Sequence, residues 1–114
     1  DAPETLLGYA MYETAAAPEA PVTERLGDVP AGHLSKLYVL AEGRGTGLAE
    51  ALVHDGVERL RRLGFRHVWL GTNAQNARAN RFYERLGFAT IGARQFVVGG
   101  EKVEDDWVRL LTVE

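Results

Sequence analysis

Two kinds of hydrophobic pattern run along the chain, one typical of helices and one of strands. In residues 48–63, leucines and valines recur at three-, four- and five-residue steps, which predicts an amphipathic helix with one apolar face. In residues 79–86, apolar residues again recur at helical spacing, which predicts a second helix. Gly64 and Gly87 directly follow these segments, where glycine commonly ends a helix. Gly56 lies inside the first helix at a cost of about 1 kcal/mol relative to alanine, so we expect it to let the helix approach the sheet closely.

Shorter runs of β-favouring, mostly apolar residues predict five strands, over residues 6–13, 33–40, 65–72, 88–98 and 103–113. The run 33–40 is apolar enough for us to expect cover on both of its faces. Gly99 and Gly100 separate the last two runs and predict a hairpin. The order strand, strand, helix, strand, helix, strand, strand indicates an α/β domain with a mixed sheet.

Residues 14–32 carry prolines, alanines and scattered charges without a clear period. They predict a mobile connection, in which residues 22–26 could form a short helical turn. A chain of 114 residues can bury one small core, so we expect a single domain over residues 1–114.

Composition excludes several functional classes. The formal net charge of −3 argues against a nucleic-acid partner, and we expect the arginines near residues 59–66 to lie on a solvated helix face. The absence of cysteine excludes a disulfide, a thiolate nucleophile and a cysteine-based metal site, and we expect no metal. No run approaches the roughly 20 apolar residues of a membrane span, and no signal peptide is visible. We therefore expect a cytoplasmic protein without a membrane partner.

Glycines gather where the predicted strand 33–40 turns into the predicted helix 48–63, in the sequence Arg44-Gly45-Thr46-Gly47-Leu48-Ala49. The first turn of a helix offers unpaired backbone N–H groups and partial positive charge, which bind anions. The spacing fits neither a dinucleotide fingerprint nor a nucleoside-triphosphate P-loop. Taken alone, the glycines are compatible with a pyrophosphate cradle and equally with a simple tight turn.

This loop resembles the Gln/Arg-x-x-Gly-x-Gly/Ala signature of the GNAT family of N-acetyltransferases, and residues 76–88 are similar to the second signature of that family. The resemblance covers roughly residues 5–113 and implies the acyl-CoA N-acyltransferase fold, a mixed, mostly antiparallel sheet with helices on both faces. Family members usually place a strand, two helices and another strand before the point where this sequence begins. The chain therefore resembles the C-terminal two-thirds of the family domain, N-terminally incomplete. An open edge at strand 6–13 would then be covered by a longer protein or by a partner, such as a second copy in a homodimer.

The resemblance also implies acetyl-CoA as cosubstrate. In the family, the pantetheine arm lies between the strand before the glycine loop and the strand after the first helix, where it would meet backbone groups of Leu37 and Val39. The diphosphate would rest on the loop itself, and helix residues would complete the site. The cofactor residues expected in this way are Leu37, Val39, Arg44, Gly45, Thr46, Gly47, Leu48, Ala49, Asn76, Ala79 and Phe82.

Two residues are candidates for catalysis. Tyr83 matches the tyrosine that family members often use as general acid on the departing thiolate; the competing interpretation is a core aromatic beside Phe82. For the base, some members carry a glutamate where this chain has Gly71, and others carry one early on the central strand, where this chain has His33. Histidine titrates in the useful range, so His33 is our candidate, with water-mediated deprotonation as an equal alternative.

The leading hypothesis is therefore an N-acetyltransferase that moves an acetyl group from acetyl-CoA to a primary amine of a small molecule or protein by direct attack. The alternative is a non-catalytic acyl-CoA-binding or interaction module of the same fold. A third interpretation, a domain that binds nothing, would require both signatures to be coincidental. The sequence does not identify the acceptor amine.

Overall fold

A computed structural model describes residues 7–14, 19–98, 100 and 102–113. In chain order the elements are β1 (Gly8–Glu13), α1 (Ala20–Leu26), β2 (Gly32–Val39), the 3₁₀ turn η1 (Ala41–Gly43), α2 (Leu48–Arg62), β3 (His67–Asn73), α3 (Ala77–Arg85), β4 (Ala89–Val98) and β5 (Lys102–Thr112). The five predicted strands and both predicted helices are confirmed, although β1 and β3 each start two residues later than expected. Residue 6 of the first predicted strand and Gly99 of the predicted hairpin lie outside the described residues. Among these described elements, no helix has the length and apolarity needed to cross a membrane.

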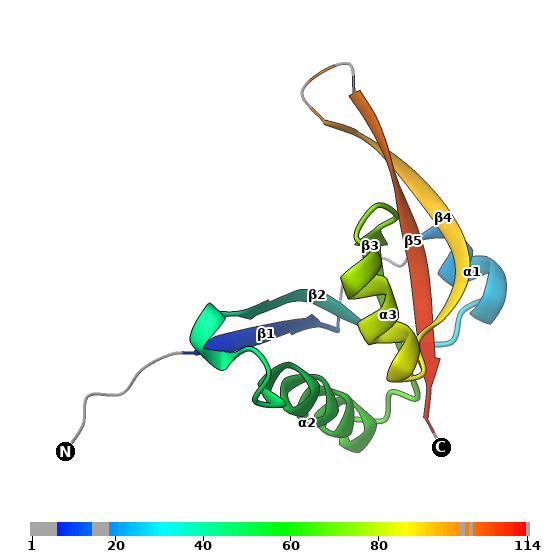
Figure 1. The fold of residues 1–114 in the computed structure, drawn as a ribbon. Coiled ribbons are helices and arrows are strands. Elements are labelled where there is room, and N and C mark those ends of the chain that lie inside the picture. The colour runs from blue at the N-terminus through cyan, green and yellow to red at the C-terminus, as the bar shows by residue number, and fades with distance from the viewer. Residues whose placement is uncertain (1–6, 15–18, 99, 101, 114) are drawn as a thin grey trace.

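The strands form one mixed sheet in the order β1-β2-β3-β5-β4 (Figure 1). Among the described strands, β2 and β3, which α2 connects, are the only parallel pair, and the other three pairs are antiparallel. The predicted mixed, mostly antiparallel sheet is therefore confirmed.

The parallel pair in the middle of this sheet is very short. β2 and β3 pair at Gly32 with Val68 and at His33 with Trp69, whereas β3 and β5 pair at seven positions along β3. Beyond His33 the two parallel strands separate, so β1 and β2 lead away from the other three strands (Figure 1). The sheet is thus forked.

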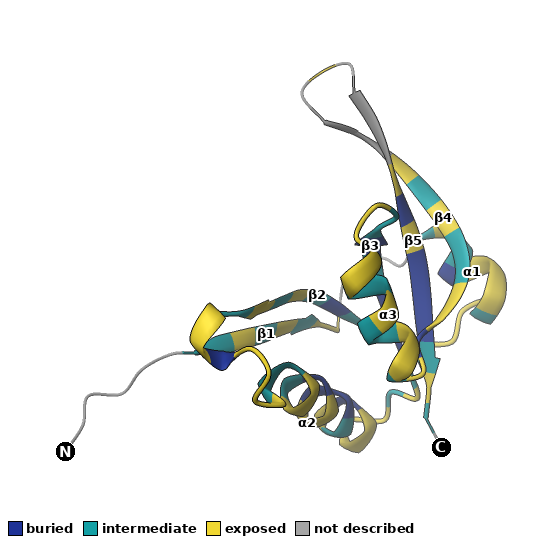
Figure 2. Cartoon of the chain, viewed as in Figure 1, coloured by how far each residue is buried: buried dark blue, intermediate teal, exposed yellow. Residues whose placement is uncertain are grey.

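Helices cover both faces of the sheet, and each face has its own apolar core. On one face, α2 and α3 pack over a cluster that includes Leu34, Val57, Leu70 and Phe88. On the other face, α1 packs over a cluster made by Val22, Ala31, Trp69, Val108 and Leu110. Figure 2 shows buried positions along β5 and on one side of α2.

The segment 14–32, expected to be a mobile connection, contains the packed helix α1. Val22 is only 1% exposed within the second core cluster, and Pro21 lies in the first turn of the helix. Proline is tolerated there because the first N–H groups of a helix have no partner to lose. The short helical turn expected at residues 22–26 is part of α1, and residues 15–18 lie outside the described residues.

The expectation that the run 33–40 would be covered on both faces is wrong for its second half. Lys36 and Tyr38 are exposed, and Tyr38 keeps 49% of its surface. The reason is the fork, because α1 covers the sheet around Trp69 and does not extend along the separated end of β2.

Candidate functional site

A cavity of about 550 Å³ opens between the separated end of β2, the glycine loop, the start of α2 and one side of α3. All of the cofactor residues expected from the sequence line it, except Thr46, and so does Tyr83. The cavity is lined by Leu37, Val39, Gly43, Arg44, Gly45, Gly47, Leu48, Ala49, Glu50, Asn76, Arg78, Ala79, Phe82, Tyr83 and Arg85. His33 is not among them.

The glycine loop leaves the start of α2 open. Gly45 and Gly47 have φ angles of +77° and +84°, which side chains rarely adopt, and no other atom lies within 4 Å of the place where their Cβ atoms would be. Gly47 is the N-cap of α2 and makes no side-chain cap bond. Intrahelical bonding begins with Ala51, whose N–H donates to the Gly47 carbonyl at 3.0 Å, so the N–H groups before it have no intrahelical acceptor.

Thr46 acts inside the loop. Its hydroxyl donates a hydrogen bond to the Gly43 carbonyl and accepts a long one, of 3.4 Å, from the backbone N–H of Leu48. The predicted cofactor residue Thr46 therefore holds the turn together, and its neighbours present the open surface.

Three arginines face the same cavity. Arg44 comes from the loop and is exposed, and sequence analysis singled it out. Arg78 and Arg85 come from α3 and were missed, although their i and i+7 positions, with Phe82 between them, place them on one side of the helix. Open N–H groups and three guanidinium groups fit the diphosphate and phosphate groups of an acyl-CoA.

Asn76 begins the helix that carries the tyrosine. Its side-chain oxygen accepts a hydrogen bond from the backbone N–H of Ala79 at 3.1 Å, which caps α3. Asn76 thus fixes the start of α3 and lines the cavity at the same time.

Tyr83 lies half-buried at the inner side of the cavity. Its ring meets Phe82 and Phe88 edge to face, with centroids 5.2 and 5.8 Å away. Burial raises the pKa of the Tyr83 hydroxyl, so the group is protonated at neutral pH and can donate a proton. The two interpretations of Tyr83 are compatible, because its ring packs against the core while the residue also lines the cavity.

His33 lies on the other face of the sheet, at the last pair before β2 and β3 separate. Its ring stacks on Trp69 with the centroids 3.8 Å apart and the planes 3° from parallel. Burial lowers the pKa of His33, and the nearby Glu13 carboxylate acts in the opposite direction. The imidazole is therefore neutral at pH 7 and can accept a proton.

The place of Gly71, where some family members carry a glutamate, is covered by Arg94. A Cβ atom on Gly71 would collide with the Arg94 guanidinium, which also pairs with Glu19 at 2.7 Å and with Asp106 at 3.1 Å. Glu19, Arg94, Gln95 and Asp106 line a smaller cavity of about 280 Å³. Sequence analysis missed this group, because Glu19 lies 75 positions before Arg94 and the members share no local motif.

Comparison with known proteins supports the family suggested by the two signatures. Residues 2–88 match the acetyltransferase (GNAT) family. An uncharacterised N-acetyltransferase of Mycobacterium tuberculosis is 45% identical over 75 residues, which are 66% of this chain and 47% of that protein. A mycothiol acetyltransferase of a Parafrankia species is 40% identical over 91 residues, 73% of this chain and 28% of that protein. The chain thus spans about half the length of the first of these relatives and less of the second.

Solved structures share the fold. The complex of Arabidopsis thaliana NAA60 with acetyl-CoA superposes with a TM-score of 0.81 at 23% identity, covering 96% of this chain and 67% of that one. A GNAT-family acetyltransferase structure from Desulfovibrio desulfuricans gives a TM-score of 0.77 at 24% identity, covering 100% of this chain and 65% of that one. At these identities the likeness concerns the fold alone.

Proposed function

Because this chain belongs to the acetyltransferase (GNAT) family, we propose that it transfers an acetyl group from acetyl-CoA to a primary amine of a small molecule or protein. The observation that carries the proposal is the 550 Å³ cavity, which joins the glycine loop to Tyr83 along the separated end of β2. One end offers groups that bind phosphates and the other offers a proton donor. An extended thioester could occupy both at once.

Binding would divide between backbone and side chains. The open N–H groups at the start of α2, with Arg44, would hold the diphosphate. Backbone groups of β2 near Leu37 and Val39, which pair with none of the described strands on the side of the fork, would hold the acyl-bearing arm as an added strand would. A backbone N–H that polarises the thioester carbonyl would contribute about 3 kcal/mol to stabilising the transition state.

The transfer removes two protons from the acceptor nitrogen, one before the attack and one as the amide forms, and supplies one to the sulfur. The acceptor ammonium must lose a proton before its nitrogen attacks the carbonyl carbon, because the protonated amine has no free electron pair. As the carbon–sulfur bond breaks, the Tyr83 hydroxyl donates a proton to the sulfur. The proton lost as the amide forms would restore the Tyr83 hydroxyl after it has protonated the sulfur. His33 or a water molecule takes the proton from the ammonium.

The alternative is a non-catalytic acyl-CoA-binding module. Two observations favour it: His33 lies outside the main cavity, and Arg94 covers the Gly71 position. The two functions differ in what they require of Tyr83, because a binding module needs its ring and an enzyme needs its hydroxyl.

Tyr83→Phe separates these functions. For an enzyme we expect turnover of acetyl-CoA with a panel of primary amines to fall about 10²- to 10⁴-fold, while affinity for acetyl-CoA is nearly unchanged. Tyr9→Phe, which removes the hydroxyl of an exposed tyrosine on β1, is the matched control. Unchanged turnover in Tyr83→Phe would remove Tyr83 as the acid, and absence of turnover in the wild type with intact acetyl-CoA binding would favour the module.

Calorimetric titration with acetyl-CoA and with CoA tests the cavity itself. Arg44→Ala should weaken binding about tenfold, because a charge-assisted contact to phosphate is lost. Arg66→Ala removes an exposed arginine outside the cavity and should bind as the wild type does. If the folded chain binds neither ligand, the cofactor assignment is wrong.

A further inference from the structure

Glu13 and His33 face each other because of an irregularity in the pairing of β1 with β2. Pairing is regular from Gly8 with Val39 to Met11 with Lys36, and after a register shift Glu13 lies opposite His33. With unbroken register Glu13 would lie opposite Leu34, whose side chain belongs to the core of the other face. The shift therefore keeps Leu34 in the core and turns His33 toward Glu13.

The register shift is a β-bulge, in which Ser35 is the extra residue. The Ser35 side chain is hydrogen-bonded across the strand pair. Its hydroxyl donates a hydrogen bond to the Met11 carbonyl at 3.2 Å. Bulges often redirect a side chain at a functional site. Here the bulge brings a carboxylate and an imidazole together at the fork of the sheet.

The orientation of the His33 ring is fixed by stacking, and its Nδ1 atom is buried. Trp69 stacks on the ring at 3.8 Å, and the buried Nδ1 atom has no hydrogen-bond partner among the residues that the structure describes. The nearest carboxylate oxygen, Oε2 of Glu13, is 3.8 Å from Nδ1. A movement of about 1 Å by the half-exposed Glu13 side chain would bring the two atoms to hydrogen-bond distance.

We propose that Glu13 and His33 form a proton-accepting pair for the acceptor amine, with His33 as the base and Glu13 as the residue that positions and polarises it. The inference rests on the proposed acetyl transfer. When Glu13 accepts a hydrogen bond from Nδ1–H, the neutral ring carries its free electron pair on Nε2. That nitrogen takes the proton of the acceptor ammonium, the resulting amine attacks the carbonyl carbon, and Glu13 stabilises the imidazolium until the proton passes to solvent.

The location supports this role. His33 belongs to the last paired position before β2 and β3 part, so an acyl group held in the fork would lie just beyond it. Tyr83 belongs to the core on the opposite face. The base His33 and the acid Tyr83 would then act on the reacting groups from opposite faces of the sheet.

Other charges act on His33 as well. Glu19, at the start of α1, favours the charged imidazole, whereas Arg94 on β4 disfavours it. Arg94 is itself paired with Glu19 and with Asp106 on β5, so these two carboxylates reduce its effect. Glu13 is the carboxylate in ion-pair range of the ring, and its removal should have the largest consequence.

The first test is an NMR titration of the His33 ring in the ligand-free chain. Glu13→Gln should shift the pKa of His33 downward, because the neighbouring negative charge that favours the imidazolium is lost. Glu24→Gln, which neutralises an exposed glutamate on α1, should leave this pKa in place. An unchanged His33 titration in Glu13→Gln would overturn the pair.

The second test is the pH profile of kcat/KM with a reactive amine. Activity should rise with pH as His33 loses its proton, and in Glu13→Gln this rise should move to lower pH while the maximal rate falls about tenfold. A merely structural role of Glu13 would lower the rate without moving the profile. Glu13→Asp should restore part of the rate, because it keeps the charge.

The outcomes separate this pair from the proposed function. Active wild type with an unmoved profile in Glu13→Gln overturns the pair and leaves acetyl transfer standing. Inactive wild type, despite a shifted His33 titration, overturns the proposed function and with it the role of the pair in catalysis.

Discussion

Gly56 sets how closely helix α2 approaches strand β1. A Cβ atom at this position would collide with the ring of Tyr12, whose hydroxyl donates to the carbonyls of Leu52 and Val53 at 3.3 and 3.2 Å. The tyrosine ring therefore lies against the helix, and its hydroxyl is hydrogen-bonded to the helix backbone. The sequence predicted the close approach from a glycine within a helix, and the structure supplies the partner.

Gly56→Ala should destabilise the chain by about 1–2 kcal/mol, although alanine is the better helix former. Helix propensity would gain about 1 kcal/mol, whereas overpacking a fixed ring costs up to about 3 kcal/mol. Urea denaturation measures the difference. Ala51→Gly, at an exposed position of the same helix, gives the propensity effect alone. A more stable Gly56→Ala variant would show that Tyr12 can move aside freely.

The glycine loop and the two family signatures predicted most of the residues that line the larger cavity, whereas contacts between distant parts of the chain could not be predicted from them. Positive φ at Gly45 and Gly47 and the cap at Asn76 follow from residue type and spacing over a few positions. The contact of Gly71 with Arg94, and that of His33 with Glu13, depend on which strands become neighbours and in which register. A single-residue shift at Ser35 is not visible in the sequence, so the partner of His33 could not be predicted.

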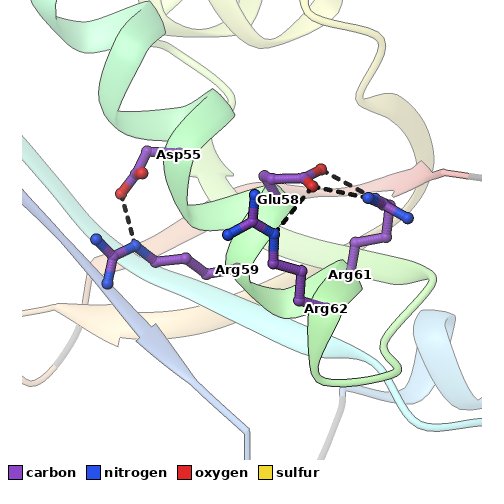
Figure 3. A network of polar contacts seen from close by, with 5 residues as sticks. All are labelled: Asp55, Glu58, Arg59, Arg61 and Arg62. Atoms are coloured by element: carbon purple, nitrogen blue, oxygen red, sulfur yellow. Dashed lines mark hydrogen bonds and ion pairs between the residues drawn. The ribbon is translucent and has the colours of Figure 1, made fainter.

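At the level of elements, the ion pairs of α2 and α1 differ in their exposure and in which elements they join. On the outer side of α2, Asp55 pairs with Arg59, and Glu58 pairs with Arg61 and Arg62 (Figure 3). These side chains are exposed, as expected for a solvated helix face. Arg94 instead joins the start of α1 to strand β5, and its partner Asp106 is only 6% exposed.

Arg94→Ala should therefore cost about 2 kcal/mol, because it leaves the buried Asp106 carboxylate without its cation. Arg59→Ala, which breaks an exposed pair on α2, should change the free energy of unfolding by about 0.5 kcal/mol or less. Urea denaturation at pH 7 compares the two. Equal losses would mean that the pairs joining α1 to the sheet stabilise no more than a surface pair does.

The Glu58 pairs predict a dependence on pH. The hydrogen bond from Arg61 lowers the pKa of Glu58 to about 2, below its ordinary value of 4.5. A carboxylate whose pKa is lower in the folded state stabilises the fold at pH values above its pKa in the unfolded chain. This stabilisation is lost as the pH falls toward 2. Denaturation curves between pH 4.5 and 2 should show a shallower loss of stability in Glu58→Gln than in the wild type. The difference should shrink with added salt, and identical slopes at low salt would contradict the prediction.

Helix α1 shows where element prediction reached its limit. Its seven residues contain Pro21, and the segment around it lacks a period, so sequence patterns favoured an irregular connection. Tertiary packing decides otherwise, because Val22 completes the core over Trp69 and Val108. A short helix is stabilised mainly by such packing and has little intrinsic signal.

At the scale of the whole molecule, the sheet consists of two parts joined at two residue pairs and by the core under α2. β1 and β2 form one part, and β3, β5 and β4 form the other (Figure 1). The proposed cosubstrate would lie in the fork and contact backbone groups that lack a strand partner there.

Hydrogen exchange should detect this occupancy. Addition of acetyl-CoA should slow exchange at the first turn of α2 and at the separated end of β2, while peptides from β5, which is paired with β3 on one side and with β4 on the other, should change little. Arg44→Ala should need more ligand for the same protection. Protection confined to β4 and β5 would place the ligand elsewhere.

The two-pair ladder also bears on the order in which the molecule assembles. The β4–β5 hairpin brings together residues close in the sequence, whereas β2 reaches β3 only after the whole of α2 has been crossed. Local contacts form at a smaller loss of chain entropy, so we expect the hairpin to belong to the folding nucleus and the β1–β2 part to dock late. Substitutions in the hairpin would then slow folding, and substitutions in β1 would mainly speed unfolding. A fork that leaves room for a ligand thus makes the β1–β2 part the first to open when the domain unfolds.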